Sequence, residues 1–469
     1  MTSFRRTKIV ATLGPATDDE AALRRLLEAG VDVVRLNFSH EDRAAHGRRI
    51  ALVRRLASEL GRVVAVMQDL QGPRIRVGEM AGGKPVRLKA GESLDISTQP
   101  VEGTERMIST SYEKLPQVVR PGDPVLLNDG LLQLRVTAVH SDRVETVVVQ
   151  GGTLSARKGV NLPQSTIDAP ALTAKDRDDL RFGLDQGVDM VALSFVRRPR
   201  DGEPARRLMR ERGARVPLLA KIERPEALDN LDGILGAFDG VMVARGDLAI
   251  EVSPEKVPVA QKRVIERANA VGKAVITATQ MLESMTRNPT PTRAEASDVA
   301  NAVLDGSDAV MLSAETSIGR YPVLAVQAMD RIIRQAETLP VTAPVSRRRG
   351  RGHAVARAAA TLAVEVDARA LAAYTRSGRT ARTLSKLLPP LPIFALTDRE
   401  TMARQLALWR GVCPLFVEGT AHIEEVTAEI DRELGRRQLL APGDLVVIVG
   451  AAPQAPAGET NFIRLVSIS

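Results

Sequence analysis

Two ionisable residues of opposite charge stand where an apolar run ends. In "LLAKIERP", residues 218–225, Lys221 and Glu223 flank Ile222. Side chains two positions apart in a β-strand point to the same face, so we expect this ammonium and this carboxylate to lie side by side at a strand tip. The pair could be an ion pair that only closes the end of a sheet, or it could hold an anion and a metal ion.

Polar residues recur at the ends of further apolar runs. They are Arg35, Asn37, Ser39 and His40; Asp69, with Arg74 and Arg76 after it; Arg245, Gly246 and Asp247; Thr279 and Gln280; and Ser313 and Glu315. Taken singly, Arg35 or Asp69 is more typical of a surface ion pair. If the runs are strands of one sheet, however, all these residues meet at one edge.

The chemistry of this set favours phosphoryl transfer. The carboxylates of Glu223 and Asp247 suit Mg²⁺, which binds one or two carboxylates and keeps other positions for water and substrate oxygens. The cations Arg35, Arg74, Arg76 and Lys221 can offset phosphate charge. A helical turn after Gly246 would direct N–H groups at an anion. Metal, cations and positioning are what phosphoryl transfer requires. Neither a Walker A pattern nor a protein-kinase glycine-rich loop with an HRD motif occurs.

Eight short apolar runs, nearly all separated by one amphipathic helical stretch, predict a closed parallel (β/α)8 barrel, the TIM-barrel fold. The runs are residues 8–14, 31–39, 62–70, 188–196, 216–223, 239–247, 273–280 and 308–315. In such barrels the chemistry gathers at the carboxyl ends of the strands. The polar residues above stand at those ends.

The remaining chain predicts two further domains. Residues 72–156, rich in Gly, Pro, Val and Thr with short alternating runs, predict a small β-barrel domain inserted over the strands' carboxyl ends as a lid. A Pro, Arg and Gly-rich linker, 339–352, precedes renewed α/β alternation. We therefore expect a catalytic barrel from 1–71 and 157–338, a lid from 72–156, and a C-terminal α/β domain from 353–469.

Composition excludes several classes of protein. The chain has 469 residues, 44% of them hydrophobic, and no apolar run long enough for a transmembrane helix. Its start lacks a signal-peptide pattern, and Cys413 is its only cysteine, so we expect a cytoplasmic protein without disulfides. The net charge of +8 invites a nucleic-acid interpretation, but only 3% of residues are aromatic and no nucleic-acid-binding motif occurs. We expect neither a nucleic-acid nor a membrane partner.

The sequence closely resembles the pyruvate kinase family along essentially its whole length. The matching stretches are "TKIVATLGPAT", "VVRLNFSH", "DLQGPRIR", "KGVNLP", "FGLDQGVDMVALSFVR", "KIERPEALDN", "DGVMVARGDLAIE", "ATQMLESM", "TRSGRT" and the long block at 291–322. The resemblance implies the last step of glycolysis, phosphoryl transfer from phosphoenolpyruvate to ADP, giving pyruvate and ATP. It also implies a homotetramer and allosteric regulation by a phosphorylated metabolite, with residues 353–469 as the regulatory domain.

The resemblance also implies roles for single residues. Glu223 and Asp247 would bind Mg²⁺, or Mn²⁺ in its place, and a second ion would arrive with the nucleotide. Lys221 and Arg35 would contact the transferring phosphoryl group. The N–H groups of Gly246 and Asp247 and the Thr279 hydroxyl would bind the pyruvate carboxylate. The proton donor to the enolate stays open between Ser313 and Thr279, acting through water. Residues assigned to the nucleotide are Asn37, His40, Arg76 and Lys158.

Two features bear on regulation and ion dependence. Where the family commonly has Thr-Lys-Gly-Pro-Glu, this chain has Leu70 to Arg74. In K⁺-dependent members that Glu accompanies a monovalent cation held at positions matching Asn37, Ser39 and Asp69. A guanidinium at Arg74 supplies positive charge there, so we expect no K⁺ requirement.

The segment "TRSGRT" follows a strand and opens a helix. Its residues Thr375, Arg376, Ser377, Gly378 and Thr380 form either a cradle for an effector phosphate or an ordinary N-capped helix start. The absence of a clear Trp-plus-Arg clamp favours a monophosphate over fructose 1,6-bisphosphate. The loop "PQAPAGET" would close over the ligand.

Two rival functions remain. Another Mg²⁺-dependent barrel that acts on phosphoenolpyruvate or pyruvate, such as an aldolase or a mutase, would not need the lid, Arg76, Lys158 or the third domain. A basic nucleic-acid-binding protein, or a chain that has lost catalysis, would not need Lys221, Glu223, Asp247 and Thr279. An assay for ATP formed from ADP separates these possibilities.

Overall fold

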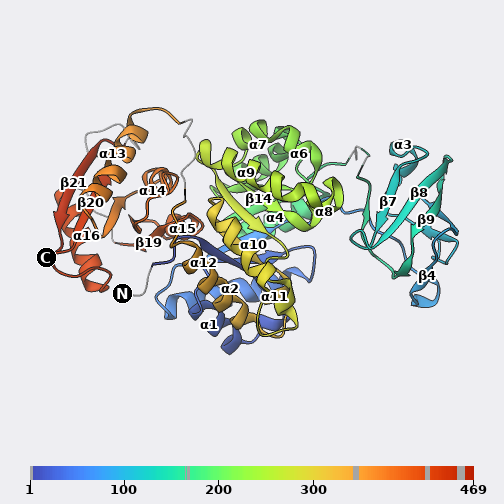
Figure 1. Ribbon diagram of the computed structural model, residues 1–469, viewed down its shortest axis with the longest axis horizontal. Coiled ribbons are helices and arrows are strands. Elements are labelled where there is room, and N and C mark those ends of the chain that lie inside the picture. Colours follow the sequence, from blue (N-terminus) through green and yellow to red (C-terminus); the bar gives the residue numbers. More distant parts are fainter. Residues whose placement is uncertain (1–3, 164, 166–168, 342–347, 418–422, 452–459) are drawn as a thin grey trace.

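The computed structural model describes residues 4–469 except 164, 166–168, 342–347, 418–422 and 452–459. Three parts follow one another along the long axis of the molecule (Figure 1). The C-terminal part lies at one end, the barrel in the middle, and the inserted β-rich part at the other end. No helix among the described residues is long and apolar enough to cross a membrane.

The predicted (β/α)8 barrel is confirmed. Its sheet is closed and parallel, in the order β1-β16-β15-β14-β13-β12-β3-β2. The strands are β1 (Lys8–Thr12), β2 (Val33–Asn37), β3 (Ala65–Asp69), β12 (Met190–Leu193), β13 (Leu218–Ile222), β14 (Gly240–Ala244), β15 (Ala274–Ala278) and β16 (Ala309–Leu312). Each falls within one of the eight apolar runs.

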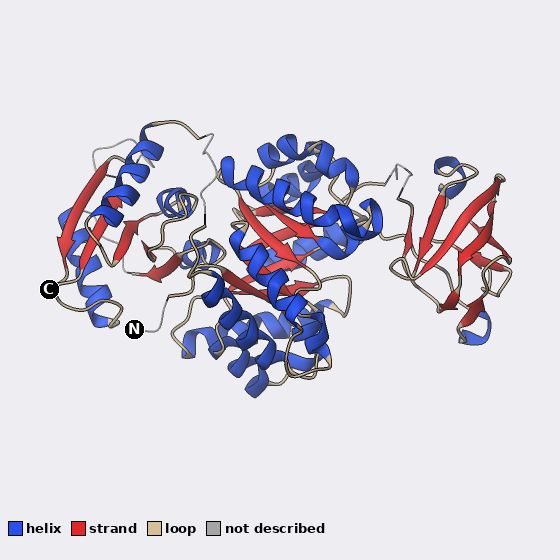
Figure 2. Cartoon of the chain, viewed as in Figure 1, coloured by secondary structure: helices blue, strands red, loops and turns tan. Residues whose placement is uncertain are grey.

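Helices surround this sheet (Figure 2). They are α1 (Glu20–Glu28), α2 (Arg43–Glu59), α4 (Ala174–Asp185), α5 (Glu203–Glu211), α6 (Pro225–Asp229), α7 (Leu231–Ala237), α8 (Arg245–Val252), α9 (Val257–Ala270), α10 (Arg293–Leu304), α11 (Ala314–Ser317) and α12 (Pro322–Ala336). Local sequence sets where they begin. In α10, for example, Thr292 and Glu295 form a capping box, in which each side chain accepts the other's backbone N–H.

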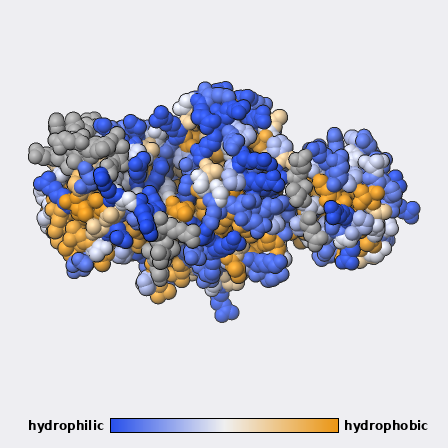
Figure 3. Space-filling view, turned by 90° about the horizontal axis from the view of Figure 1, so that it is seen from above, coloured by the Kyte–Doolittle hydropathy of each residue, from blue (hydrophilic) through white to orange (hydrophobic). Residues whose placement is uncertain are grey.

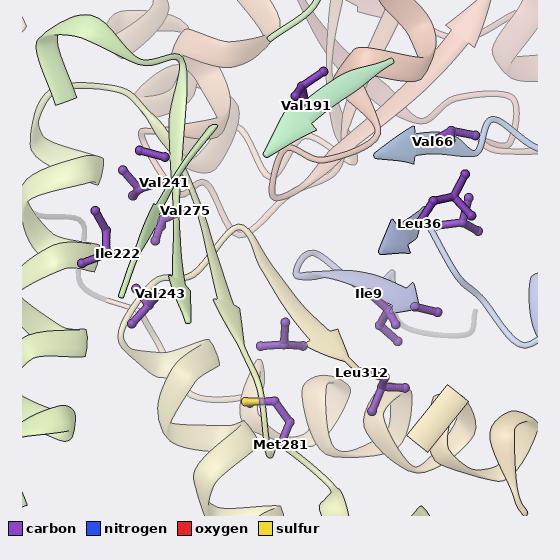
Figure 4. Packing of buried hydrophobic residues seen from close by; sticks show 14 of the residues in the cluster. Ile9, Leu36, Val66, Val191, Ile222, Val241, Val243, Val275, Met281 and Leu312 are labelled. Carbon is purple, nitrogen blue, oxygen red and sulfur yellow. The ribbon is translucent and has the colours of Figure 1, made fainter. Parts of the chain in front are cut away.

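Alternation along the strands separates two apolar layers. Ile222, Val241 and Val243 belong to the layer between the sheet and the helices (Figure 4). Leu219 and Met242 belong instead to the cluster inside the barrel. Because the period of a strand is two, Lys221 follows Leu219 on the inner face while Ile222 points to the helices. The alternation that the sequence predicts for Lys221 and Glu223 is therefore present.

The inserted part forms a six-stranded sheet, ordered β11-β7-β8-β9-β5-β6, and a two-stranded sheet of β10 and β4. Its elements are β4 (Val86–Leu88), β5 (Ser93–Ser97), β6 (Met107–Ser109), α3 (Leu115–Val118), β7 (Pro124–Leu127), β8 (Leu132–Val139), β9 (Arg143–Gln150), β10 (Gly152–Leu154) and β11 (Val160–Asn161). Single-residue bridges of Arg76 to Gly159 and of Val77 to Thr110 link the two edges of the larger sheet. Strand β11, which lies beyond the predicted lid boundary at 156, pairs with β7 in this sheet.

The C-terminal part is the predicted α/β unit. Its sheet has the order β19-β18-β17-β20-β21, with only β21 antiparallel to its neighbour. Its elements are α13 (Arg351–Glu365), β17 (Ala370–Tyr374), α14 (Arg379–Ser385), β18 (Ile393–Thr397), α15 (Glu400–Leu406), β19 (Val412–Phe416), α16 (Ile423–Arg436), β20 (Leu445–Gly450) and β21 (Phe462–Ser467).

Buried polar contacts join this part to the amino-terminal end of the barrel. The Lys386 ammonium pairs with Asp308 and donates to Asn269 Oδ1 at 2.7 Å. The Lys8 ammonium donates to the carbonyl of Val412 at 2.7 Å. Because breaking a buried pair leaves an uncompensated charge, these contacts resist separation of the two parts.

Candidate active site

Lys221 lies at the centre of the polar cluster inside the barrel. Its Nζ lies 2.8 Å from Glu223 Oε1 and 3.3 Å from Asp69 Oδ1, and it donates to Ser194 Oγ at 2.8 Å. Burial alone would lower the pKa of Lys221, but the carboxylates of Asp69 and Glu223 outweigh it and raise the pKa. The ammonium therefore stays charged and is held in one position.

Arg35 is the second buried cation of the cluster. Its Nε donates to Asp69 Oδ2 at 2.7 Å, and its Nη1 donates to Thr12 Oγ1 at 3.0 Å. Burial acts to raise the pKa of Asp69, but Lys221 and Arg35 outweigh it and lower the pKa. Asp69 thus positions two cations with one ionised carboxylate.

The two carboxylates predicted to bind metal differ in their surroundings. Glu223 is only 1% exposed and accepts the backbone N–H of Phe195 at 2.7 Å. Burial raises the pKa of Glu223; Lys221 opposes this rise and the nearby Asp247 carboxylate adds to it. Asp247 lies in the first turn of α8 and lines two cavities. Two carboxylates close enough to repel each other make a donor set that a divalent cation would stabilise.

The segment after β15 carries backbone strain. Thr279 and Gln280 have positive φ angles of 69° and 54°, which β-branched residues such as threonine rarely adopt. The Thr279 hydroxyl accepts the N–H of Gly246 at 2.7 Å and lies 2.6 Å from the carbonyl of Ala278. Strain of this kind persists where the surrounding structure enforces it and is typical of functional sites.

Ser313 differs from Thr279 in its hydrogen bonding. It follows β16, and its buried Oγ makes no hydrogen bond to any described residue. Its own N–H is held by Glu315 Oε2 at 2.7 Å. A buried hydroxyl without a partner is costly, so this group is ready to bond to a ligand or a water molecule.

A large cleft separates the barrel from the inserted part. Its volume is about 1290 Å³. Gly246, Asp247, Thr279 and Ser313 line its barrel side, and the turn at 129–130 lines its lid side. The two parts are seen as separate bodies in the space-filling view from above (Figure 3).

A smaller cavity of about 380 Å³ brings together three of the four residues assigned to the nucleotide. His40, Arg76 and Lys158 line it, with Arg74 and Asp247. Burial lowers the pKa of His40, and the guanidinium groups of Arg74 and Arg76 lower it further. The cavity is therefore strongly basic, with a neutral imidazole at its edge.

Asn37 and Ser39 do not line either cavity. The Asn37 side chain accepts the N–H of Ser39 at 3.2 Å, which fixes the turn after β2. Asp69 is the third residue at the expected monovalent-cation position. Its carboxylate already forms ion pairs with Arg35 and Lys221.

Sequence reasoning missed two further hydroxyl residues at strand ends, Thr12 and Ser194. Thr12 ends β1 and orients Arg35, while Ser194 follows β12 and bonds to both Lys221 and the carbonyl of Leu70. The rule that placed the other residues would have found both, because each continues the inward face of its strand. Gly72 has φ +71°, and a Cβ there would lie 3.1 Å from that of Ser194. Only glycine allows this turn to pack so closely on the site.

The residues assigned to an effector stand together after β17. Arg376 Nε donates to Asp398 Oδ2 at 3.0 Å, and the hydroxyls of Thr380 and Thr460 lie 2.8 Å apart. Gly378 has φ +72°. Helix α14 has seven residues. Except for Thr460, the loop expected to close over the ligand, residues 453–460, lies outside the described residues.

Family models and individual relatives point to the same protein family. The model of the barrel domain of pyruvate kinase matches residues 4–326, and that of its alpha/beta domain matches residues 353–466. A pyruvate kinase of Mycobacterium tuberculosis is 47% identical over 463 residues, covering 98% of both chains. One from Corynebacterium glutamicum is 46% identical, covering 98% of this chain and 97% of its own length.

A solved structure agrees. The crystal structure of a pyruvate kinase from Cryptosporidium parvum superposes with a TM-score of 0.93 at 38% identity, covering 99% of this chain and 96% of that one. The chain therefore belongs to the pyruvate kinase family of phosphotransferases.

Proposed function

We propose that the chain transfers the phosphoryl group of phosphoenolpyruvate to ADP in a Mg²⁺-dependent reaction. The P–O bond to the enolate oxygen breaks, a bond to a terminal oxygen of ADP forms, and the enolate takes up a proton at carbon to give pyruvate. The observation that carries the proposal is the buried contact of Lys221 with Glu223, near Asp247, which lines the large cleft. In this proposal a cation and the two carboxylates that we assign to the metal lie together.

Glu223 and Asp247 fit a divalent ion, with Mg²⁺ favoured and Mn²⁺ possible. Their oxygens are the hard donors that this ion prefers, and a site with two carboxylates leaves positions for substrate oxygens. Burial raises the pKa of Glu223 and the Asp247 carboxylate raises it further, and a bound cation would relieve both effects. When bound, the ion would neutralise charge on the phosphate and the enolate.

Lys221 and Arg35 stabilise the phosphoryl group in this proposal. Asp69 and Glu223 hold the Lys221 ammonium without neutralising it by proton transfer, because the raised pKa of Lys221 keeps its proton. Arg35 uses Nε and Nη1 for Asp69 and Thr12, so Nη2 is the nitrogen that we assign to the phosphate. Charges fixed before the reaction cost no reorganisation in the transition state.

We assign the pyruvate carboxylate to Gly246, Asp247 and Thr279, and enolate protonation to Ser313 through water. The Thr279 hydroxyl lies within hydrogen-bond distance of both the Gly246 N–H and the Ala278 carbonyl. Ser313 Oγ is buried and lacks a partner among the described residues. Of the two donors that the sequence left open, Ser313 is therefore the one free to order a water molecule.

Replacing Ser313 by alanine should slow enolate protonation and lower kcat by about 10²-fold, the scale of general acid–base effects. Exchange of the pyruvate methyl protons with D₂O, followed by NMR, measures this step without phosphoryl transfer. Ser317→Ala, a hydroxyl change one turn further along the chain, is the control. Methyl exchange at the wild-type rate in Ser313→Ala would refute the assignment.

We assign the basic cavity of about 380 Å³ to ADP, with His40, Arg76 and Lys158 as contacts. The cavity adjoins Asp247, so a nucleotide phosphate there lies beside the metal ligands. Asn37, also assigned to the nucleotide, supports this region by fixing the turn that leads to His40.

We propose that the enzyme does not need K⁺, because Arg74 supplies a fixed positive charge beside the site. The charge of Arg74 contributes to the lowered pKa of His40, so the guanidinium acts within this cavity. A monovalent ion at Asn37, Ser39 and Asp69 would also face Arg35 and Lys221, which already neutralise Asp69.

The Arg74→Glu variant should gain K⁺ dependence. We expect wild-type activity in Tris buffer to rise less than twofold with 100 mM KCl added, and the variant to need K⁺ for about tenfold or more of its activity, since one charge reversal near the site changes phosphate binding by this order. Choline chloride at equal ionic strength is the control. Strong K⁺ stimulation of the wild type would contradict the proposal.

Three further proposals rest on the family resemblance. We propose a homotetramer, a cytoplasmic location, and an allosteric effector with one phosphate at Thr375, Arg376, Ser377, Gly378 and Thr380. A panel of sugar monophosphates and AMP in the activity assay identifies the effector.

A coupled assay tests the function itself. Purified protein with phosphoenolpyruvate, ADP and Mg²⁺ should form ATP and pyruvate in equal amounts. Pyruvate without ATP would indicate a hydrolase. No turnover of phosphoenolpyruvate would contradict the proposal and favour the rival barrel enzymes, an aldolase or a mutase. Salt-sensitive binding to generic DNA without turnover would favour the nucleic-acid alternative.

A further inference from the structure

A buried ion pair joins the two segments that carry the carboxylates assigned to the metal. Arg224 directly follows Glu223 after β13, and Glu251 lies one helical turn after Asp247 in α8. Nη1 of Arg224 lies 2.8 Å from Oε2 of Glu251, and the two side chains are only 3% and 2% exposed. Helix α8 lies on the side of the barrel that faces the inserted part (Figure 1). The pair therefore ties the end of β13 to α8 beside the assigned metal site.

The chain that returns from the inserted part is held by the same pair. Nδ2 of Asn161, in β11, donates to Oε1 of Glu251 at 3.1 Å. Nη2 of Arg224 donates to the carbonyl of Ser165 at 2.9 Å. Both charged side chains line the cavity that we assign to ADP. Three segments that are far apart in the sequence thus meet at two buried charges.

Stability alone is a weak reason for this arrangement. Burial raises the pKa of Glu251, and Arg224 and Asn161 offset the rise only in part. Oε2 of Glu251 faces Arg224 without an aligned hydrogen bond to any described residue, so charge rather than hydrogen bonding holds the contact. Replacing a buried ion pair by uncharged groups often leaves stability unchanged or raises it. The location of the pair beside the metal ligands is the stronger reason.

Both ends of the helix that carries Asp247 are anchored. At the first position of α8, Arg245 pairs with Asp298 at 2.6 Å. In its last turn, Glu251 pairs with Arg224. Groups that bind an ion must be held within about 0.5 Å of the productive geometry by the residues around them. A helix anchored at only one end would therefore misplace the Asp247 carboxylate.

We propose that Arg224 and Glu251 are positioning residues for the divalent ion, which together set the distance between the carboxylates of Glu223 and Asp247. In this proposal neither residue contacts the ion or the substrate. The inference rests on the proposed function, because it requires that Glu223 and Asp247 bind the ion. Replacing residues that orient metal ligands typically lowers metal affinity or activity by about 10–100-fold.

Two single variants separate positioning from the effect of charge alone. Binding of Mn²⁺ to full-length Arg224→Met and Glu251→Gln is followed by electron paramagnetic resonance, without turnover. If only charge mattered, loss of the Arg224 cation would tighten Mn²⁺ binding and loss of the Glu251 anion would weaken it. A positioning pair predicts one sign, so each variant should bind Mn²⁺ about tenfold or more weakly than wild type. Tighter or unchanged binding in Arg224→Met would overturn the proposal.

The double variant Arg224→Met/Glu251→Gln separates positioning from stability. Each single variant removes one partner of a buried pair and should melt at a lower temperature than wild type. The double variant leaves neither charge unpaired and should melt closer to wild type. Its affinity for Mn²⁺ should stay at the level of the single variants, because the same interaction is removed only once. Recovery of Mn²⁺ binding together with the melting temperature would show that the pair serves stability alone.

Arg410→Met is the matched control. Arg410 is buried and pairs with Glu337, with 3.5 Å between Nη1 and Oε1 and both side chains 4% exposed, but this pair joins the barrel to the C-terminal part. The control variant should lose stability as Arg224→Met does and should bind Mn²⁺ as tightly as wild type. An equal loss of Mn²⁺ binding in Arg410→Met would mean that metal affinity follows stability wherever a pair is broken, and would refute the specific role of Arg224.

Glu223→Gln distinguishes failure of this inference from failure of the proposed function. If Mn²⁺ binding is weakened in Glu223→Gln but unchanged in Arg224→Met and Glu251→Gln, the metal assignment stands and only the positioning role is overturned. If Mn²⁺ binding is unchanged in Glu223→Gln, the metal assignment is wrong and the inference fails with it.

Discussion

Replacing Lys221 by methionine will lower kcat by about 10³-fold or more and change the KM for phosphoenolpyruvate much less. Removal of one preorganised donor from a site that stabilises developing charge has effects of 10²–10³-fold, and here a full charge is lost as well. Arg35 remains to bind the phosphate in the ground state. Steady-state kinetics of the purified variant measures both constants.

Lys386→Met is the matched control for this variant. That ammonium is as deeply buried as Lys221 and pairs with Asp308, but it lies at the other end of the barrel. We expect it to lower stability while kcat stays within a few-fold of wild type. Near-normal turnover of Lys221→Met, or an equal loss of kcat in both variants, would show that Lys221 has no specific role.

Replacing Glu223 by glutamine should be nearly as damaging and should act through the metal. The amide keeps the size of the side chain but removes one of the two charges that we assign to Mg²⁺ and the partner of Lys221. We expect kcat to fall by about 10³-fold and the Mg²⁺ concentration for half-maximal activity to rise at least tenfold, on the scale of lost charge-assisted contacts.

Binding of Mn²⁺, followed by electron paramagnetic resonance, tests this independently of turnover. Glu223→Gln should bind the ion more weakly than wild type does. Glu255→Gln, a carboxylate that lines the same cleft, should bind it normally. If both variants bound Mn²⁺ as tightly as wild type, Glu223 would not be a ligand.

The barrel could be predicted from the sequence because its signal is local. Each strand is an apolar run bounded by turn residues, and eight of them alternate with helices in one order. Closure follows from this regularity. The strand pairing of the inserted sheet could not be predicted from the sequence. Strands β11 and β7, for example, form an antiparallel pair between residues more than thirty positions apart, and no local pattern specifies such a pairing.

The catalytic cluster could be predicted for the same reason. The period of two in β13 places Lys221 and Glu223 on the inner face, and the structure puts their charged atoms 2.8 Å apart. The roles of Thr12 and Ser194 were not predicted, because hydroxyl residues are common in strands. Only their position at the carboxyl ends of the strands, on the inner face, brings them to Arg35 and Lys221.

Features that depend on contacts between distant segments stayed out of reach. One example is a cavity lined by Arg382 and Trp409, which forms where the C-terminal part meets the barrel. Its lining residues are as far apart in the sequence as 190 and 409. No periodicity relates such positions. The hydrogen bonding that separates Ser313 from Thr279 as proton donors likewise needs atomic positions.

The site of the divalent ion tests the proposed chemistry most directly. A crystal grown with Mn²⁺ and pyruvate, measured at the manganese absorption edge, locates the ion by its anomalous signal. We expect a peak about 2.1–2.2 Å from carboxylate oxygens of both Glu223 and Asp247, close to the bond lengths of a small hard cation. A fully occupied manganese peak elsewhere in the molecule, with none between these two residues, would contradict it.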